Sequence, residues 1–573
     1  MLKFNIIAYK RGNTIFDLHH HSIENDMVPI LRDSNEGINI LKNSFVQVLQ
    51  LALNRIYNTS SNGMITITPS GFYYDFIGSS VSSNDFNEIE KKINEIIKEN
   101  IPFKKNITKN INEDNFFKRN EEDLYTMELG DFQCLSNGAQ LLSTAFLGDG
   151  FKLINISEVC HEKLRVQRIE VFFFSNQEKL IEHLNLWEKE KANDHRIIGK
   201  PFFWFSEMSS GIPFWTALGQ KLRLNIESYL RKLLADNYEE VRTPFIMNNK
   251  LWQLTGHAEK YDENMFHTEN GCLKPMNCPG HALIFSQKNL TYKDLPIRIS
   301  EFGICHRRED HGGLLGLKRS YALTIDDGHI FCEIQHIVQE VTSFIKMAIS
   351  VYKEFNLKLK VVKISTRPEK YIGDLNNWNE AEKILKETLN SCNIEYVIAE
   401  GDGAFYGPKI ELHVEDNLNR TWQCGTIQVD FFLSERLDCY YIDSDGKKKN
   451  PVILHRAILG SMERFIAIIL ENGLPLRWHP SPVVFIIISN NEVSFESQIK
   501  ELKVHIPNST IDLENENINN RIKKWIGITP LIVVCGIKEL QGIDASNISN
   551  MKINVRNIGD MTIKELKDHI NNN

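Results

Sequence analysis

The sequence has no apolar run long enough to span a membrane. One of its longest aliphatic stretches, residues 483–488, is far shorter than the ~20 apolar residues that a transmembrane helix needs. The amino terminus has neither an uninterrupted apolar segment nor a small-residue cleavage site, so export is not expected. We therefore expect a cytoplasmic protein without a membrane partner.

The sequence also lacks an excess of basic residues and has no closely spaced cysteine pairs. Lys and Arg number 66 and Asp and Glu 74, which gives a net charge of −8, so any contact with nucleic acid must come from local patches. The ten cysteines include no CxxC pair, which is typical of reduced thiols and leaves room for a few metal ligands at most. With 42% hydrophobic and 24% charged residues, the chain is neither collagenous nor wholly disordered.

The length of 573 residues is enough for three or four domains. Helical periodicity over 38–57 and 86–97, with a strand-like segment over 64–76 between them, predicts an α+β unit over 1–175. A charged linker helix is expected over 176–200. The largest part, 201–477, contains nearly every chemically suggestive cluster.

The last part, 478–573, alternates short buried strands with helices. Strands are expected over 483–489, 510–513, 531–536 and 551–557, and helices over 496–506, 517–527 and 562–573. This alternation predicts a small α/β domain with a mainly parallel sheet. Thr562 and Glu565 have the spacing of a capping box at the start of the last helix.

Four runs stand out in the largest part: KPMNCPGH at 274–281, EFGICHRRE at 301–309, DDGHIFC at 326–332 and HRAILGSMER at 455–464. Together and in this order they resemble the threonyl-tRNA synthetases, which are class II aminoacyl-tRNA synthetases. The match is close over 199–478 and fainter toward both ends. It implies an α+β multidomain protein with an antiparallel-sheet catalytic domain, an N-terminal editing-like domain and a C-terminal anticodon-binding α/β domain.

The resemblance implies activation of L-threonine by ATP with Mg²⁺ and transfer of the threonyl group to tRNA(Thr). Attack of a carboxylate on the α-phosphate builds negative charge, which Arg307 is suited to offset. Glu309 is suited to the adenine amino group, Arg319 to the outer phosphates, and Arg464 to stacking on adenine. Taken alone, the Arg-Arg-Glu run would more simply form surface salt bridges; the surrounding motifs favour the ATP site.

Cys278, His329 and His455 lie far apart in the sequence, so their spacing gives almost no metal signal. By resemblance they bind one Zn²⁺ per subunit, and three ligands leave positions open for the amino and hydroxyl groups of threonine. A site that requires a hydroxyl rejects valine by as much as ~10⁴–10⁵, whereas loss of a methyl group, as in serine, costs only ~1–3 kcal/mol.

Further site residues follow from the same resemblance. Asp327, Tyr406, Lys409 and Thr426 are expected beside the amino acid, and Gln423 and Gln428 beside the adenylate, with Gln428 counted among the catalytic residues. His257 matches a mobile-loop histidine that assists transfer to the tRNA ribose, and its imidazole could move a proton near pH 7. The simpler alternatives are a turn-capping Asp327 and a solvent-facing His257.

A homodimer is implied by residues 216–244, an amphipathic helix followed by a strand, which an ordinary core helix would equally explain. Leu323 and Ile325 stand where the family usually has Phe and Gln. We expect no ubiquitin-like module before the N-terminal part, and the four expected editing positions of this part read Asn43, Gln47, Cys134 and Gly138. Because these four positions do not provide the two imidazoles that the hydrolysis needs, we expect little or no hydrolysis of seryl-tRNA.

The C-terminal part has 10 Lys or Arg and 11 Asp or Glu over 483–573, a net charge of −1, which is a weak electrostatic footprint for RNA. Two alternatives therefore stay open. One is a divergent paralogue that activates threonine for another acceptor or serves as an inhibitor-resistant second copy. The other is a regulator that binds threonine or RNA without turnover, against which the retained Arg307, Arg464 and metal ligands argue.

Overall fold

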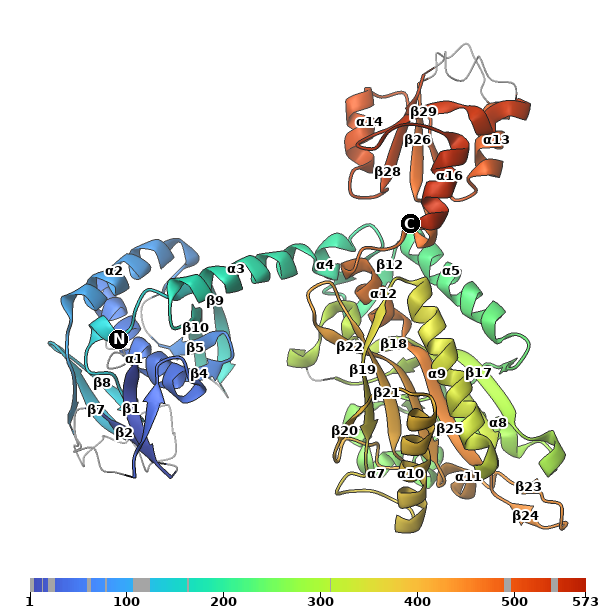
Figure 1. Ribbon diagram of the computed structural model, residues 1–573, viewed down its shortest axis with the longest axis horizontal. Coiled ribbons are helices and arrows are strands. Elements are labelled where there is room, and N and C mark those ends of the chain that lie inside the picture. Colours follow the sequence, from blue (N-terminus) through green and yellow to red (C-terminus); the bar gives the residue numbers. More distant parts are fainter. Residues whose placement is uncertain are drawn as a thin grey trace. The chain divides into compact units, whose positions relative to one another are not determined.

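The computed structural model describes residues 5–12, 14–18, 26–58, 63–77, 80–106, 124–161, 164–309, 311–488, 496–536 and 545–573. The chain separates into two compact units, Met1–Lys189 and Glu190–Asn573 (Figure 1). The finer division into four parts stays a prediction.

The first unit is an α+β structure. Its largest sheet is antiparallel, in the order β4 (Met64–Thr68), β5 (Gly71–Phe76), β10 (Leu164–Phe173) and β9 (Phe151–His161). Helix α1 (Asn35–Tyr57) packs on it, with Phe45 against Phe72, Phe151 and Phe173. The single strand expected over 64–76 is instead a hairpin, because Pro69 and Ser70 form the turn between β4 and β5.

Two smaller sheets and a second helix complete this unit. They are β2 (Thr14–Asp17), β1 (Ile6–Arg11) and β3 (Val28–Leu31); β6 (Phe103–Asn106), β7 (Leu124–Leu129) and β8 (Phe132–Asn137); and α2 (Phe86–Glu99). The apolar residues Ile89, Ile93 and Ile96 of α2 are buried, as their helical spacing predicts. Helix α3 (Gln177–Ala192) follows, so the expected linker helix ends at Ala192, and α4 (His195–Ile198) is separate.

An eight-stranded sheet is the centre of the second unit. Its order is β13 (Glu239–Glu240), β17 (Ile297–His306), β18 (Ala322–Cys332), β25 (Val452–Ser461), β22 (Thr421–Asp430), β21 (Lys409–Glu415), β19 (Lys358–Ser365) and β20 (Val397–Ala399). The six inner strands pair antiparallel, and only the edge pairs β13–β17 and β19–β20 are parallel. The predicted antiparallel catalytic sheet is confirmed.

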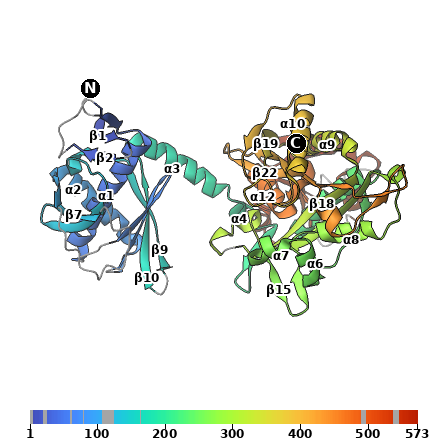
Figure 2. The same ribbon diagram turned by 90° about the horizontal axis from the view of Figure 1, so that it is seen from below.

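Helices cover this sheet and bury its apolar side chains. Helix α9 (Ile337–Glu354) packs against β25, β22 and β19, and α10 (Leu375–Ser391) lies beside α9 (Figure 2). Helix α5 (Ala217–Leu234) begins at Thr216, whose side chain caps the Gly219 N–H, and α12 (Met462–Glu471) begins after β25. The remaining helices are α6 (Asn249–Leu254), α7 (His257–Lys260), α8 (Cys278–Ser286) and α11 (Leu433–Arg436).

Short hairpins and sheets surround the large sheet. They are β11 (Phe203–Ser206) with β12 (Ser209–Trp215); β14 (Ile246–Met247), β16 (Gly271–Leu273) and β15 (Phe266–Thr268); and β23 (Tyr441–Ile442) with β24 (Lys448–Lys449).

The C-terminal residues form a five-stranded sheet in the order β27 (Thr510–Asp512), β26 (Val483–Ile487), β28 (Leu531–Cys535), β29 (Lys552–Val555) and β30 (Gly559–Thr562), with helices α13 (Glu496–His505), α14 (Ile518–Trp525) and α16 (Ile563–Asn572). The sheet is mixed rather than mainly parallel. Strand β26 is parallel to both neighbours, but β29 and β30 form a tight hairpin and must run antiparallel. The capping box of Thr562 and Glu565 is confirmed. Ser489, the expected end of the first strand, lies outside the described residues.

Within the described part of the chain, no helix combines the length and the apolarity that crossing a bilayer requires. None of the nine cysteines whose side chains are described forms a disulfide bond.

Candidate active site

The motif residues converge on one pocket over β18, β22 and β25, with a cavity volume of about 390 Å³. Its lining includes twelve of the fourteen site residues expected from the sequence: Cys278, Arg307, Glu309, Arg319, Asp327, His329, Tyr406, Gln423, Thr426, Gln428, His455 and Arg464. Leu323 and Ile325 line it as well. His257 and Lys409 are not among the lining residues.

Sheet register brings the three expected metal ligands together. His329 on β18 and His455 on β25 are direct partners in the antiparallel ladder, and Cys278 is the first residue of α8. The sulfur and ring nitrogens of the three residues lie within 4.8 Å of one another, and all three are buried. His329 Nε2 and His455 Nδ1 face each other at 2.9 Å.

The chemistry of this donor set fits Zn²⁺. Thiolate and imidazole are the ligands that Zn²⁺ prefers in proteins. Burial lowers the pKa of His329 well below its ordinary value, so its ring is neutral and offers a lone pair. Burial also raises the pKa of the Cys278 thiol, so a bound cation is what would stabilise a thiolate there.

A second cluster with metal-like geometry, Asp194, His195 and Glu471, does not have the charge for a cation. Glu471 already accepts from His195 Nδ1 at 2.7 Å, from Lys318 Nζ at 2.6 Å and from Arg420 Nη2 at 2.8 Å. Two cationic side chains neutralise this carboxylate, so we read the cluster as a structural ion-pair network.

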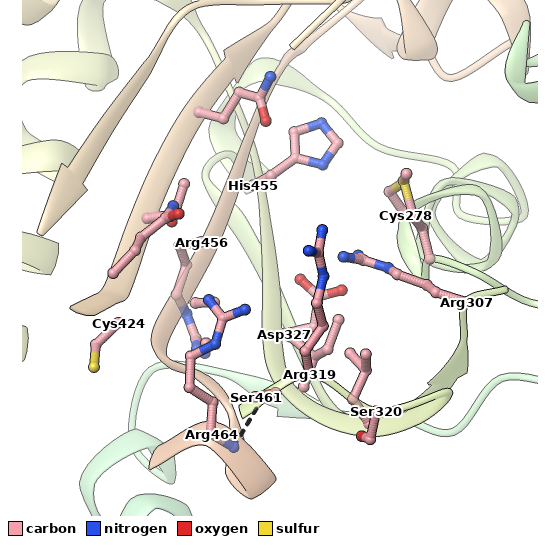
Figure 3. A pocket seen from close by; sticks show the side chains of 18 of the residues that line it. Cys278, Arg307, Arg319, Ser320, Asp327, Cys424, His455, Arg456, Ser461 and Arg464 are labelled. Carbon is pink, nitrogen blue, oxygen red and sulfur yellow. Dashed lines mark hydrogen bonds between the residues drawn. The ribbon is translucent and has the colours of Figure 1, made fainter. Parts of the chain in front are cut away.

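Three guanidinium groups line the same pocket as the expected metal ligands. Figure 3 shows Arg307, Arg319 and Arg464 directed toward its interior. Among the described residues, Arg307 has no carboxylate within ion-pair distance; its Nε donates to the Pro275 carbonyl at 3.2 Å. Its charge is therefore available to an anion in the pocket.

Arg319 and Arg464 are held by neighbouring groups. Arg319 Nε lies 3.1 Å from Glu309 Oε2, so the carboxylate expected at adenine is paired with a cation in this structure. Arg464 lies in the first turn of α12, which Ser461 caps, and its Nε donates to the Lys318 carbonyl at 3.0 Å. Burial lowers the pKa of Arg464.

Polar side chains near the metal ligands form local hydrogen bonds. Asp327 Oδ2 accepts from Asn277 Nδ2 at 3.0 Å, and the Tyr406 ring lies 5.2 Å from the His455 ring. On β22, Gln428 Nε2 donates to the Gly407 carbonyl at 2.8 Å. On the same strand, Gln423 Nε2 donates to Thr426 Oγ1 at 2.8 Å.

The two expected residues outside the lining have other partners. His257 is buried rather than solvent-facing: its Nδ1 lies 2.8 Å from Thr255 Oγ1, and its Nε2 lies 3.3 Å from the sulfur of Met276, which lines the pocket. Burial lowers the pKa of His257 to about 4. The Lys409 ammonium lies 2.6 Å from Glu411 Oε1.

Sequence reasoning missed two basic residues of the lining, Lys318 and Arg456. Arg456 is fully buried; its Nη1 donates to the Asp326 carbonyl at 2.9 Å, and among the described residues its Nε and Nη2 have no hydrogen-bond partner. Arg456 was visible beside His455 in the sequence, but the motif alone does not say which way its side chain points.

The four expected editing positions meet in the first unit, although they come from α1 and from the end of β8. A Cβ atom at Gly138 would lie 3.5 Å from Asn43 Nδ2, and the Cys134 thiol donates to Gln47 Oε1. Gln47 Nε2 donates to Ser136 Oγ at 2.9 Å. Burial raises the pKa of Cys134 to about 12, so this thiol is not a nucleophile at neutral pH.

Comparison with known proteins identifies the kind of chain that carries these features. Residues 260–473 match the tRNA synthetase class II core domain (G, H, P, S and T). The threonine–tRNA ligase of Ehrlichia canis is 38% identical over 94% of this chain and 90% of its own length, and that of Acidovorax sp. is 36% identical over 93% and 89%.

Solved structures of aminoacyl-tRNA synthetases are also similar to this chain. The RNA-binding domain of threonyl-tRNA synthetase from Cryptosporidium parvum is 34% identical, with a TM-score of 0.60, over 66% of this chain and 98% of that one. Prolyl-tRNA synthetase from Giardia lamblia is 14% identical with a TM-score of 0.51 over 68% and 79% of the two chains, which is a likeness of fold alone.

Proposed function

The chain belongs to the threonine–tRNA ligase family of class II aminoacyl-tRNA synthetases, and we propose that the pocket over β18, β22 and β25 is where it activates L-threonine with ATP and transfers it to tRNA(Thr). One observation supports this most strongly: a Cys/His/His donor set and three guanidinium groups line the same cavity. The donor set suits a hydroxyl amino acid on a metal, and the guanidinium groups suit ATP with its Mg²⁺.

In the first step, a carboxylate oxygen of threonine attacks the α-phosphorus of ATP, the bond to the bridging oxygen breaks, and pyrophosphate leaves. Arg307 offsets the charge that builds on the α-phosphate, because its guanidinium has no competing carboxylate among the described residues. Arg319 holds the outer phosphates and Arg464 stacks on adenine. Glu309 serves the adenine amino group, which requires that its pair with Arg319 loosens.

Threonine is selected at the expected metal ligands. Cys278, His329 and His455 would hold one Zn²⁺ per subunit, and Zn²⁺ when bound supplies a Lewis acid with open positions for an amino group and a hydroxyl. Asp327 and Tyr406, which lie beside these ligands, orient the amino acid. Thr426 lines the same pocket beside the amino acid, and Gln423 and Gln428 line it beside the adenylate.

In the second step, the terminal ribose hydroxyl of tRNA(Thr) attacks the threonyl carbonyl, AMP leaves, and we assign the hydroxyl proton to His257. A pKa of about 4 keeps this imidazole neutral at pH 7, and the ring becomes a stronger base once it leaves this buried position, because burial is the main cause of the low pKa. For His257 to reach the pocket, the Met276 side chain that contacts its Nε2 must turn aside.

We further propose that the first unit does not hydrolyse seryl-tRNA, because Asn43, Gln47, Cys134 and Gly138 provide no imidazole. A homodimer formed through residues 216–244 also stays part of the proposal. The divergent paralogue with another acceptor is not favoured, because the threonine–tRNA ligases found as relatives match more than nine tenths of this chain.

Exchange of labelled pyrophosphate into ATP by the full-length chain tests the activation step. We expect exchange that depends on threonine. Exchange with serine should be weaker by the factor that corresponds to ~1–3 kcal/mol, and exchange with valine should be lower by as much as ~10⁴–10⁵-fold. Exchange with valine equal to that with threonine would contradict selection through the hydroxyl.

A further inference from the structure

A buried set of polar side chains lies behind the metal ligands, outside the pocket lining. Lys274 Nζ donates to Glu301 Oε1 at 3.0 Å and to Thr243 Oγ1 at 2.7 Å. Thr243 donates to Glu301 twice, from Oγ1 to Oε2 at 2.8 Å and from its N–H to Oε1 at 3.1 Å. His281 Nε2 lies 3.1 Å from Glu301 Oε2. Lys274 and His281 are 0% exposed and Glu301 is 4% exposed.

These contacts define which atom of His281 carries its proton. Three donors from Lys274 and Thr243 already surround the Glu301 carboxylate, so it can only accept. Burial alone would raise the pKa of Glu301, but the hydrogen bonds from His281 and Thr243 and the charge of Lys274 lower it to about 2. His281 must therefore donate from Nε2, and its Nδ1 is left as an acceptor.

His281 in turn determines the tautomer of the expected metal ligand His329. His281 Nδ1 lies 2.7 Å from His329 Nδ1, and only one of the two can donate. Since His281 Nδ1 accepts, His329 carries its proton on Nδ1. Its Nε2 then presents a lone pair, and this is the atom that faces His455.

The opposite side of the site is fixed in a similar way. Asp430 Oδ1 accepts from the backbone N–H groups of Phe432 and Leu433 at 2.7 and 3.1 Å, and its Oδ2 lies 3.0 Å from His455 Nε2. His455 therefore donates from Nε2 and presents the lone pair of Nδ1. Two lone pairs face each other at 2.9 Å, an arrangement that is favourable only with a cation between them.

We propose that Lys274, Glu301 and His281, named here the 274–301–281 relay, are positioning residues that hold His329 in the Nδ1–H tautomer and thereby set the metal affinity of the site. This inference rests on the proposed Zn²⁺ site of Cys278, His329 and His455. It predicts that the relay tunes metal binding without touching threonine or ATP, since none of its three residues lines the pocket.

The chain offers a matched control for a purely structural role. Lys318, Glu471 and His195 form a second buried Lys–Glu–His network, with distances of 2.6 Å and 2.7 Å at the carboxylate. Its histidine leads away from the metal ligands, because His195 Nε2 accepts from the Leu317 N–H at 3.1 Å. Breaking either network removes a buried ion pair, but only one of them adjoins His329.

Glu301→Gln is the first test variant. An amide nitrogen at the position of Oε1 would oppose the donors Lys274 and Thr243, and at the position of Oε2 it would oppose His281 and reverse the relay. Glu471→Gln is its control. Both variants are made in the full-length chain, and thermal unfolding followed by circular dichroism reports how much each destabilises the fold.

Two further variants separate the ring nitrogens of His281. His281→Asn keeps an acceptor near Nδ1, facing His329, and loses the link to Glu301, whereas His281→Gln keeps a polar group near Nε2 and loses the acceptor. A structural role of the buried ring would make both substitutions equal in effect. The relay predicts that they differ in metal binding.

The measurement is Zn²⁺ affinity by competition with a chelator, with the visible absorption of the Co²⁺-loaded chain as a report on ligand geometry. We expect wild type and Glu471→Gln to bind one Zn²⁺ with equal affinity. Glu301→Gln and His281→Gln should bind about 10–100-fold more weakly with altered Co²⁺ spectra, as is usual for groups that orient metal ligands. His281→Asn should remain close to wild type.

Wild-type affinity in Glu301→Gln, or equal losses in His281→Asn and His281→Gln, would overturn the relay while leaving the Zn²⁺ site intact. A loss in Glu471→Gln as large as that in Glu301→Gln would assign both effects to general destabilisation and overturn it too. A wild-type chain that binds no Zn²⁺ is a different result, because it would reject the proposed metal site itself and the relay with it.

Discussion

His329 Nε2 and His455 Nδ1 face each other 2.9 Å apart, although the two residues are 126 positions apart in the chain. They are partners in the β18–β25 ladder, so the register of two strands creates a site that no local motif encodes. Cys278 completes the set from the start of α8. We therefore begin the tests of single residues with these three side chains.

Cys278→Ser is expected to remove Zn²⁺ and threonine activation together, because a hydroxyl is a poor substitute for a thiolate on zinc. Metal analysis and pyrophosphate exchange measure the two effects. Cys439→Ser is the matched control: this thiol is also buried, donates to the Ala282 carbonyl at 3.3 Å and is absent from the pocket lining. A zinc-free wild-type chain that still activates threonine would contradict the assignment.

Arg307→Ala is expected to lower threonine-dependent pyrophosphate exchange by ~10²–10³-fold or more while Zn²⁺ stays bound, because the change deletes charge stabilisation on the α-phosphate and leaves the metal ligands in place. Arg308→Ala is the control, since this neighbouring side chain is exposed. An Arg307→Ala variant with activity within a few-fold of wild type would show that another cation does this work.

Deacylation of preformed seryl-tRNA(Thr) should proceed at the rate seen without enzyme. The reason is chemical: the four editing positions hold two amides, a thiol whose pKa burial raises to about 12, and a glycine. Gly138 has a φ of +70°, so a histidine there would also be strained. Clear acceleration by the chain would mean that other residues form a hydrolytic site.

His257→Gln should change the pH dependence of stability. Burial lowers the pKa of His257 from an ordinary value near 6.5 to about 4, so between these pH values the unfolded chain binds a proton that the folded chain does not. Wild type therefore loses stability as the pH falls from about 6.5 to about 4, by up to about 3 kcal/mol from this residue.

The variant lacks this contribution. Thermal unfolding of wild type and His257→Gln at pH 7.5 and pH 5 should show a smaller drop for the variant. Equal drops would mean that His257 titrates normally and is not held neutral by burial. Comparing the two chains cancels the contribution of His479, whose pKa burial also lowers to about 4.

Much of the fold follows from local pattern. The buried stripe of α1, the helical spacing in α2 and the capping box at Thr562 are visible in the sequence because their period or spacing is short. The turn inside 64–76 and the hairpin of β29 and β30 are harder to predict, because short turns between strands leave only weak signals in the sequence. Strand register is not visible at all, although it assembles the metal ligands.

The direction in which a side chain points is the second feature that could not be predicted from the sequence. Lys409 matches a family position, yet its ammonium pairs with Glu411, which lies two residues along β21 and therefore on the same face of the strand. His257 lies in a polar run, yet it is buried against Trp252 and Met276. The resemblance names His329 as a metal ligand but assigns no role to His281, which contacts the His329 ring, or to Glu301, which contacts His281.

Charging of tRNA(Thr) with labelled threonine by the full-length chain tests the central claim most directly. We expect threonyl-tRNA(Thr) to accumulate in an ATP-dependent reaction. Cys278→Ser should abolish this accumulation, and Arg307→Ala should slow it by ~10²–10³-fold or more. Normal threonine-dependent pyrophosphate exchange without any charging of tRNA(Thr) would contradict the account, because it would show that the pocket activates threonine for a different acceptor.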